Sequence, residues 1–219
     1  MSELFLYITF FLLTLLISVY LNGYINKIFV DNKLTDPVNE RSSHKYPATR
    51  SGGISIFFTV CLACAFGIST GQLTIPLYAL LSVFFLTFTG FVDDLIEVRY
   101  REKLFLQLFA GVLMINSGYS IDSFHGVFYV YELPSWVEII VSIFVFVVVV
   151  NALNLIDGLD GMASFISIKF FLIIGGIVLV SKTEWFIFFP IIISALLGFL
   201  WFNFNRNKKV FLGDTGSLF

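Results

Sequence analysis

The chain has 219 residues, of which 58% are hydrophobic and only 13% are charged, and its formal net charge is −2. Soluble domains are about half apolar and about a quarter charged, so this composition excludes an ordinary globule in water. The lysines and arginines form no long basic run, which argues against a nucleic-acid-binding protein.

Long apolar stretches make up most of the chain. A membrane-spanning helix needs about 20 mostly apolar residues. Seven segments reach or approach that length, and an eighth begins near Leu218; the seven are 3–22, 54–71, 74–92, 104–119, 136–155, 162–181 and 185–204. We therefore predict an all-α fold, a polytopic transmembrane helical bundle of about seven spans. It forms a single integral membrane domain over 1–219 that we expect to be incomplete at its C-terminus.

The cations are distributed unevenly between the predicted connections. Eleven of the 13 Lys and Arg residues follow the first, third or seventh span, whereas the connections after the second, fourth and sixth spans hold only Lys182. Cytoplasmic connections are enriched in these residues, so we expect the N-terminus to lie outside. Four polar segments then share the cytoplasmic side: 27–50, 93–103, 154–161 and 205–217.

The outer connection between the fourth and fifth predicted spans holds a run of aromatic and β-branched residues with one glycine, at 124–130. Such a composition is typical of short strands. We therefore predict a short hairpin there, close to the membrane surface.

Two adjacent carboxylates, Asp93 and Asp94, end the third predicted span, and Lys103 and Gln107 begin the fourth. Adjacent carboxylates repel each other unless a cation or a shared proton relieves the repulsion. A Mg²⁺ held by one or two carboxylates and by substrate phosphate oxygens would do so. Solvation in a loop is the other interpretation, and the pair alone does not decide between them.

Two glycine-rich acidic tracts follow the fifth and seventh predicted spans. The first, 154–161, contains two Asp-Gly pairs that begin at Asp157 and Asp160, and the second, 211–217, surrounds Asp214 with glycines and hydroxyls. Glycine allows a close backbone approach to an anion, and carboxylates hold a cation. Because all the polar segments share one predicted face, together they indicate a site for Mg²⁺ and phosphate at a membrane surface.

The first polar segment ends with Lys45 and Arg50 shortly before the glycine pair at 52–53. Cations beside a glycine-rich helix entry suit a diphosphate or a lipid phosphate. The same residues also fit an ordinary cytoplasmic connection.

Three of these motifs together resemble the polyprenyl-phosphate N-acetylhexosamine-1-phosphate transferases (glycosyltransferase family 4). They are the aspartate pair with Lys103 and Gln107, the Asn-x-x-Asp-Gly-x-Asp-Gly tract at 154–161, and Phe-x-Gly-Asp-x-Gly-Ser at 211–217. The motifs occur in the family's order over nearly the whole chain. The first connection is similar to that of the branch that initiates O-antigen and related surface glycans, and it resembles the peptidoglycan-precursor translocases less closely.

The resemblance implies an enzyme that transfers a sugar 1-phosphate from a UDP-N-acetylhexosamine to undecaprenyl phosphate and releases UMP. It implies Mg²⁺ or Mn²⁺ as cofactor and a bacterial plasma membrane location with a cytoplasmic active site, at the start of cell-surface polysaccharide (cell-wall or lipopolysaccharide) synthesis. The sugar, the choice between a one-step and a covalent route, and homodimer formation stay open.

The same resemblance implies roles for individual residues. Asp93 or Asp94 would be catalytic and deprotonate the lipid phosphate, and Asp214 would bind the metal. Lys45 would contact a phosphate and Phe211 would lie against uracil. The implied substrate-binding set is Lys45, Arg50, Lys103, Asn154, Asp157, Gly158, Asp160 and Phe211.

The chain also departs from the family pattern. Pro47-Ala48-Thr49-Arg50 stands where the family has Pro-Thr-Pro-Arg, and the family's later spans and histidine-bearing loop would lie beyond residue 219. We therefore expect a truncated member whose own activity is open. Two alternatives remain from the residues alone. One is a transporter, which would place carboxylates near mid-span, and the other is a non-catalytic membrane scaffold.

Overall fold

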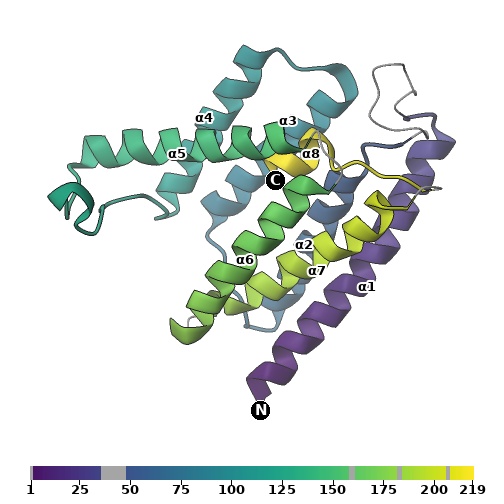
Figure 1. Cartoon of the computed structure of the whole chain (residues 1–219), viewed down its shortest axis with the longest axis horizontal. Coiled ribbons are helices and arrows are strands. Elements are labelled where there is room, and N and C mark those ends of the chain that lie inside the picture. The colour runs from purple at the N-terminus through teal and green to yellow at the C-terminus, as the bar shows by residue number, and fades with distance from the viewer. Residues whose placement is uncertain (1, 36–47, 158–160, 182–183, 206–207) are drawn as a thin grey trace.

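The computed structural model describes residues 2–35, 48–157, 161–181, 184–205 and 208–219. Within these ranges the chain forms eight α-helices and two 3₁₀ turns, and the only β-type pairing there is an isolated bridge between Thr49 and Val210. The predicted all-α fold is therefore confirmed (Figure 1).

The first seven α-helices follow the seven predicted spans in order. The helices are α1 (Ser2–Asp31), α2 (Gly52–Ser69), α3 (Leu77–Ile96), α4 (Tyr100–Asn116), α5 (Ser135–Ile156), α6 (Met162–Ser181), α7 (Phe188–Asn203) and α8 (Gly213–Leu218), and the 3₁₀ turns are η1 (Val127–Tyr129) and η2 (Glu184–Ile187). Among the described residues five helices are long and apolar enough to cross a membrane, namely α1, α2, α3, α5 and α6. The chain is thus a multi-pass membrane protein.

Two predicted spans are shorter than expected. α7 is an apolar helix of 16 residues, and α4 has 17 residues with a charged first turn. The expected start of an eighth span near Leu218 is instead the end of the short helix α8, which begins at Gly213. By length and composition, five of the seven predicted spans are therefore helices that can cross a membrane.

The predicted outer hairpin near 124–130 was wrong. Residues 117–134 are all described, and they form the single 3₁₀ turn η1 with no paired strands. His125, Gly126 and Tyr129 have φ values of 48°, 88° and 62°. Left-handed backbone at three positions turns the chain too sharply for an extended ladder, although the Gly126 N–H still donates to the Val130 carbonyl at 3.0 Å.

The larger buried cluster lies where α7 packs against α1, α2 and α6. Its most enclosed side chains include Phe10, Ile56, Ile191 and Phe199. The Ser18 hydroxyl of α1 also donates to the Ala195 carbonyl of α7 at 2.8 Å. Short α7 is therefore covered by longer helices rather than by lipid alone.

A smaller cluster joins α3, α4, α5 and α8 through Leu86, Ala110, Val150 and Leu218. Figure 1 shows α8, in yellow, near the middle of the molecule, and it packs against α2, α3 and α5. Helices α2, α3 and α5, which are distant from α8 in the sequence, therefore share this six-residue partner, which carries Asp214.

Candidate active site

Asp94, near the end of α3, holds the start of α8. One carboxylate oxygen accepts the Asp214 N–H at 2.9 Å, and the other accepts the N–H and the hydroxyl of Thr215 at 2.9 and 2.6 Å. Arg50 Nη1 lies 3.8 Å from Asp94 Oδ1, and the Asp94 side chain is only 4% exposed. A carboxylate is a favourable partner for the free N–H groups of a helix start. Asp94 therefore places α8, with both of its oxygens already engaged.

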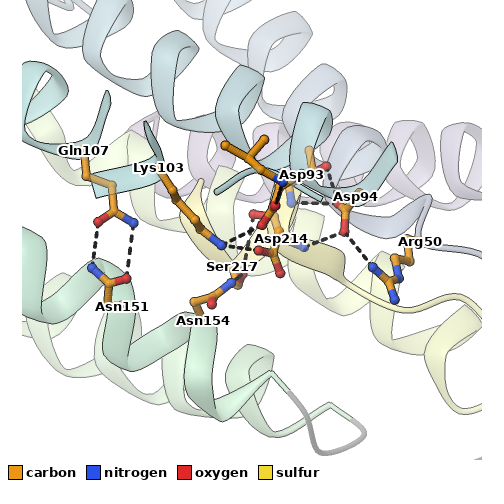
Figure 2. A network of polar contacts seen from close by, with 11 residues as sticks. Arg50, Asp93, Asp94, Lys103, Gln107, Asn151, Asn154, Asp214 and Ser217 are labelled. Carbon is orange, nitrogen blue, oxygen red and sulfur yellow. Dashed lines mark hydrogen bonds and ion pairs between the residues drawn. The ribbon is translucent and has the colours of Figure 1, made fainter. Parts of the chain in front are cut away.

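Lys103 joins the other aspartate of the pair to α8. Its Nζ lies 2.8 Å from Asp93 Oδ2 and also donates to the Asp214 carboxylate. Asp93 Oδ1 accepts the Val98 N–H at 2.6 Å. The side chains of Lys103 and Asp93 are each 15% exposed, and that of Asp214 is 30% exposed. One ammonium group thus holds two carboxylates together, and Asp214 is the more accessible of them (Figure 2).

The end of α5 supplies the opposite side of the site. Asn154 Nδ2 donates to the Ser217 hydroxyl of α8 at 2.8 Å. Asp157 caps the C-terminus of α5. The pKa of Asp157 is raised to about 7, mainly by burial and also by the charges of Asp214 and Asp94, while the Gly213 N–H and Arg50 oppose the rise. The described carboxylates thus outnumber the cations beside them.

Glycines allow α2 and α3 to touch the backbone of α8. A Cβ added at Gly53 would lie 2.1 Å from Gly216 N, and one at Gly90 would lie 2.3 Å from the Asp214 carbonyl oxygen. Contacts that close are impossible for any larger residue without movement of the backbone. These glycines are therefore required by the close approach of the helices to α8.

The segment before α2 is bound to the segment before α8 by its backbone. The Phe211 N–H donates to the Thr49 carbonyl at 2.7 Å, and the Gly52 N–H donates to the Phe211 carbonyl at 3.0 Å. The Gly53 N–H donates to the Leu212 carbonyl at 2.8 Å. Lys209 Nζ lies 5.4 Å from the centre of the Phe211 ring. These bonds bring Arg50, Phe211 and the start of α8 to one edge of the site.

Most of the predicted site residues come together. Those that contact one another or are coupled by charge are Arg50, Asp93, Asp94, Lys103, Asn154, Asp157 and Asp214. Phe211 adjoins them through its backbone, whereas Lys45, Gly158 and Asp160 lie outside the described residues.

Sequence reasoning missed two residues of this neighbourhood. Thr215 binds Asp94 through both its backbone and its hydroxyl, and Asn151 forms a reciprocal amide pair with Gln107. Asn151 precedes Asn154 by three residues, so the two lie on one face of a helix. That spacing is the signal that could have found Asn151.

The donor chemistry of the site fits a divalent cation shared with a substrate. Among the described residues no three His, Cys, Asp or Glu side chains are placed to hold a metal by themselves. Mg²⁺ takes one or two carboxylates and completes its shell with phosphate oxygens and water. Asp214, partly exposed and next to other carboxylates, is suited to that role, and a cation would relieve the excess of negative charge.

Comparisons with known proteins agree with this chemistry. Residues 76–219 match glycosyl transferase family 4. A probable undecaprenyl-phosphate N-acetylglucosaminyl 1-phosphate transferase of Bacillus subtilis is 30% identical, over 95% of this chain and 58% of its own length. Phospho-N-acetylmuramoyl-pentapeptide-transferases of Streptococcus sanguinis and Nautilia profundicola are 28% and 31% identical, over 96% and 99% of this chain and 68% and 72% of their own lengths.

This chain is therefore shorter than these relatives, and it spans 58% of the length of the Bacillus protein. The family match nevertheless covers more than half of the chain and includes α3, α4, α5 and α8, which carry most of the site. By that match, the chain belongs to glycosyl transferase family 4.

Proposed function

We propose that the protein transfers the 1-phosphate of an N-acetylhexosamine from a UDP-sugar to undecaprenyl phosphate, releases UMP and so initiates a cell-surface polysaccharide. The observation that carries the proposal is the cluster in which Lys103 joins Asp93 to Asp214 at the end of the membrane-spanning helix α3. The names of the Bacillus and Streptococcus relatives, both of them phosphosugar transferases, support the same reaction class.

The reaction requires little more from the protein than positioning and charge neutralisation. An oxygen of the lipid phosphate forms a bond to the sugar-linked phosphorus, and the bond from that phosphorus to the bridging oxygen of UMP breaks. A Mg²⁺ held by Asp214 would neutralise the diphosphate and the departing UMP. Lys103 keeps Asp214 and Asp93 side by side, and Asn154 fixes the far end of α8.

Asp93 is better placed than Asp94 to accept a proton from the lipid phosphate. Both oxygens of Asp94 hold α8, so a proton there would disrupt the position of Asp214. Asp93 accepts hydrogen bonds from Lys103 and from the Val98 N–H, but neither of these bonds holds α8, and Asp93 is more exposed than its neighbour. A proton from the lipid phosphate would therefore pass to Asp93, and the same residue could serve a one-step or a covalent route.

The carboxylates lie at helix ends rather than at mid-span, which favours surface chemistry over a transport pathway. Asp93 and Asp94 occupy the last turn of α3, and Asp157 caps α5. Together with the excess of cations in the connections after α1, α3 and α7, this supports a site on the cytoplasmic side of a bacterial plasma membrane.

The test uses this chain in sealed proteoliposomes that contain undecaprenyl phosphate. UDP-N-acetylglucosamine, UDP-N-acetylquinovosamine and UDP-N-acetylfucosamine are supplied in turn, with Mg²⁺ or Mn²⁺ or with a chelator, and UMP and lipid-linked sugar are measured. We expect equal amounts of both products, from one sugar above the others, and none with the chelator. Turnover that is unchanged by the chelator would contradict the proposal. Flux of the sugar nucleotide across the membrane without release of UMP would also contradict it. An inactive chain beside an active longer relative would favour the scaffold alternative.

A further inference from the structure

A pair of carboxamides, buried Gln107 and partly buried Asn151, joins α4 to α5 next to the charged site. Asn151 Nδ2 donates to Gln107 Oε1 at 2.7 Å, and Gln107 Nε2 donates to Asn151 Oδ1 at 3.3 Å (Figure 2). Asn151 Nδ2 also donates to the Val147 carbonyl at 2.8 Å, so both of its hydrogens are used. Gln107 is 1% exposed and has no surface to offer a substrate. The pair therefore connects helices rather than binding a ligand.

Each amide stands one helical turn from a residue of the site. Lys103 precedes Gln107 by four residues on α4, and Asn154 follows Asn151 by three on α5. Residues at these spacings share a helix face. Figure 2 shows Gln107 and Lys103 along one helix and Asn151 and Asn154 along the helix that faces it. Any shift between the two helices at the pair is thus passed directly to Lys103 and Asn154.

The other contacts between α4 and α5 are apolar and carry little information about register. Gly111 faces the Phe146 ring, because a Cβ there would lie 3.2 Å from Phe146 Cδ1. Ala110 and Val150 belong to the small apolar cluster with Leu218. Apolar side chains in a membrane gain no hydrophobic energy from one helix register over another, whereas an interhelical amide pair satisfies its hydrogen bonds in one register only.

A polar contact that fixes the register is especially important for α5. Only 11% of the most apolar 18-residue stretch of α5 is buried in the protein. Figure 1 shows α5 running across the picture at a wide angle to α1 and α6. Toward its N-terminus, α5 is held by hydrogen bonds of Ser142 and Glu138 to the connection that precedes it. Toward the site, the amide pair links α5 to α4, and Asn154 links it to Ser217 of α8.

We propose that Gln107 and Asn151 are positioning residues, which set the register of α4 against α5 and thereby hold Lys103 and Asn154 on the two sides of α8 during transfer. The consequence for turnover rests on the proposed function. A reacting group misplaced by about 1 Å can lower a rate on the order of 10²-fold, so loss of the pair should reduce catalysis without removing any group that touches substrate.

The decisive variants exchange the two amides. Gln107→Asn and Asn151→Gln each change the length of one arm, whereas the double variant keeps both amides and the total number of methylene groups. We expect each single variant to lower kcat for UMP release on the order of 10- to 100-fold, with KM for the UDP-sugar changed by less than about threefold. The double variant should recover most of the loss, because it restores a reciprocal amide pair whose arms have the same total length.

Ser82→Ala is the matched control. The Ser82 hydroxyl donates to the Ala110 carbonyl at 2.8 Å, so this variant also removes a buried hydrogen bond to α4, but from α3 and farther from Lys103 along α4. We expect kcat within about twofold of the parent, in line with the small energies of single hydrogen bonds between membrane helices. A control loss equal to that of the single amide variants would overturn the proposal.

A measurement of structure separates this proposal from the proposed function. Spin labels at Phe105 of α4 and Phe144 of α5, which are both exposed, report the distance between the helices once Cys61 and Cys64 are replaced by alanine. We expect one narrow distribution for the parent and the double variant, and a shifted or broadened one for Gln107→Leu. If the parent lacked turnover but gave this pattern, the proposed function would fail and the helix positioning would stand. A parental distribution in Gln107→Leu, or a double variant with no recovery, would overturn the proposal.

Discussion

Adjacent residues of the aspartate pair have different tasks, because successive side chains on a helix point about 100° apart. Asp94 is enclosed by the backbone of α8 and by Thr215. Asp93 points instead to Lys103 and to the Val98 N–H. The motif therefore contains one residue that positions α8 and one that pairs with Lys103, a division that the sequence Asp-Asp does not reveal.

Asp214→Asn tests the metal role at the residue scale. The substitution keeps shape and hydrogen bonding but removes one anionic ligand, and a metal can stabilise the transition state by several kcal/mol. We expect turnover to fall on the order of 10²- to 10⁴-fold, measured as UMP release at matched amounts of protein in the membrane. Asp122→Asn, in the connection between α4 and α5, is the control and should change little. Equal effects of the two substitutions would remove the basis for the site.

Asp157 makes stability depend on pH. Its pKa is raised from 3.8 to about 7 in the folded protein. Between these values the folded chain holds a proton that the unfolded chain has released, so stability should fall as pH rises from about 4 to about 7 and then level off. Thermal unfolding in metal-free buffer at several pH values measures the slope. Asp157→Asn should flatten it over that window, and an unchanged slope would show that another group is responsible.

At the scale of the elements, α8 depends on the glycines of its neighbours. Gly53 and Gly90 belong to different helices, and each allows contact with the backbone of α8. Asp94 then bonds to the N–H groups of Asp214 and Thr215 at the start of that helix. The position of Asp214 is thus determined by backbone contacts as much as by side chains.

Gly90→Ala tests this arrangement. The added Cβ would lie 2.3 Å from the Asp214 carbonyl oxygen, and overpacking of this kind costs typically about 1–3 kcal/mol. We expect a lower melting temperature and a loss of UMP release. Gly176→Ala, in the interior of α6, is the matched control because nothing lies within 4 Å of its added Cβ. Helix propensity there favours alanine by about 0.5–1 kcal/mol, so a loss at position 176 equal to that at 90 would refute the close-contact explanation.

The order of the helices was predictable from the sequence, but several of their limits were not. α1 continues to Asp31, well beyond the predicted end at residue 22. Asn22 and Asn26 end the apolar run, yet both are buried, and Asn26 accepts the Thr49 hydroxyl at 2.7 Å. Polar residues of this kind led to the prediction of a loop, because the apolar pattern of a segment gives no information about hydrogen-bond partners in distant segments. The pairing of Gln107 with Asn151 was hidden for the same reason.

For the whole molecule, the uneven charges predicted which segments would meet. Arg50, Lys103, Asn154 and Asp214 come from the four predicted polar segments, and the structure brings all four to one cluster. Alternation of apolar spans is sufficient for that inference, since every second connection returns to the same side. The angles between the helices depend on side-chain packing, and no pattern in the sequence predicted the inclined course of α5.

The same charges predict an orientation in the membrane, which can be measured directly. In a background without native cysteines, Lys208→Cys should react with a membrane-impermeant maleimide only from the cytoplasmic side, and His125→Cys only from the outside. Each variant serves as the control for the other. The reverse pattern would place the polar segments outside and would contradict the cytoplasmic site.

The backbone pairing of residues 49–53 with 209–212 also constrains how the protein is made. Thr49 and Val210 are neighbours in space, although more than 150 positions separate them in the chain. A ribosome delivers the first partner long before the second, so α2, α3 and α5 enter the bilayer before their shared partner α8 exists. The proposed site is consequently completed only after α8 has been synthesised and has docked against these helices.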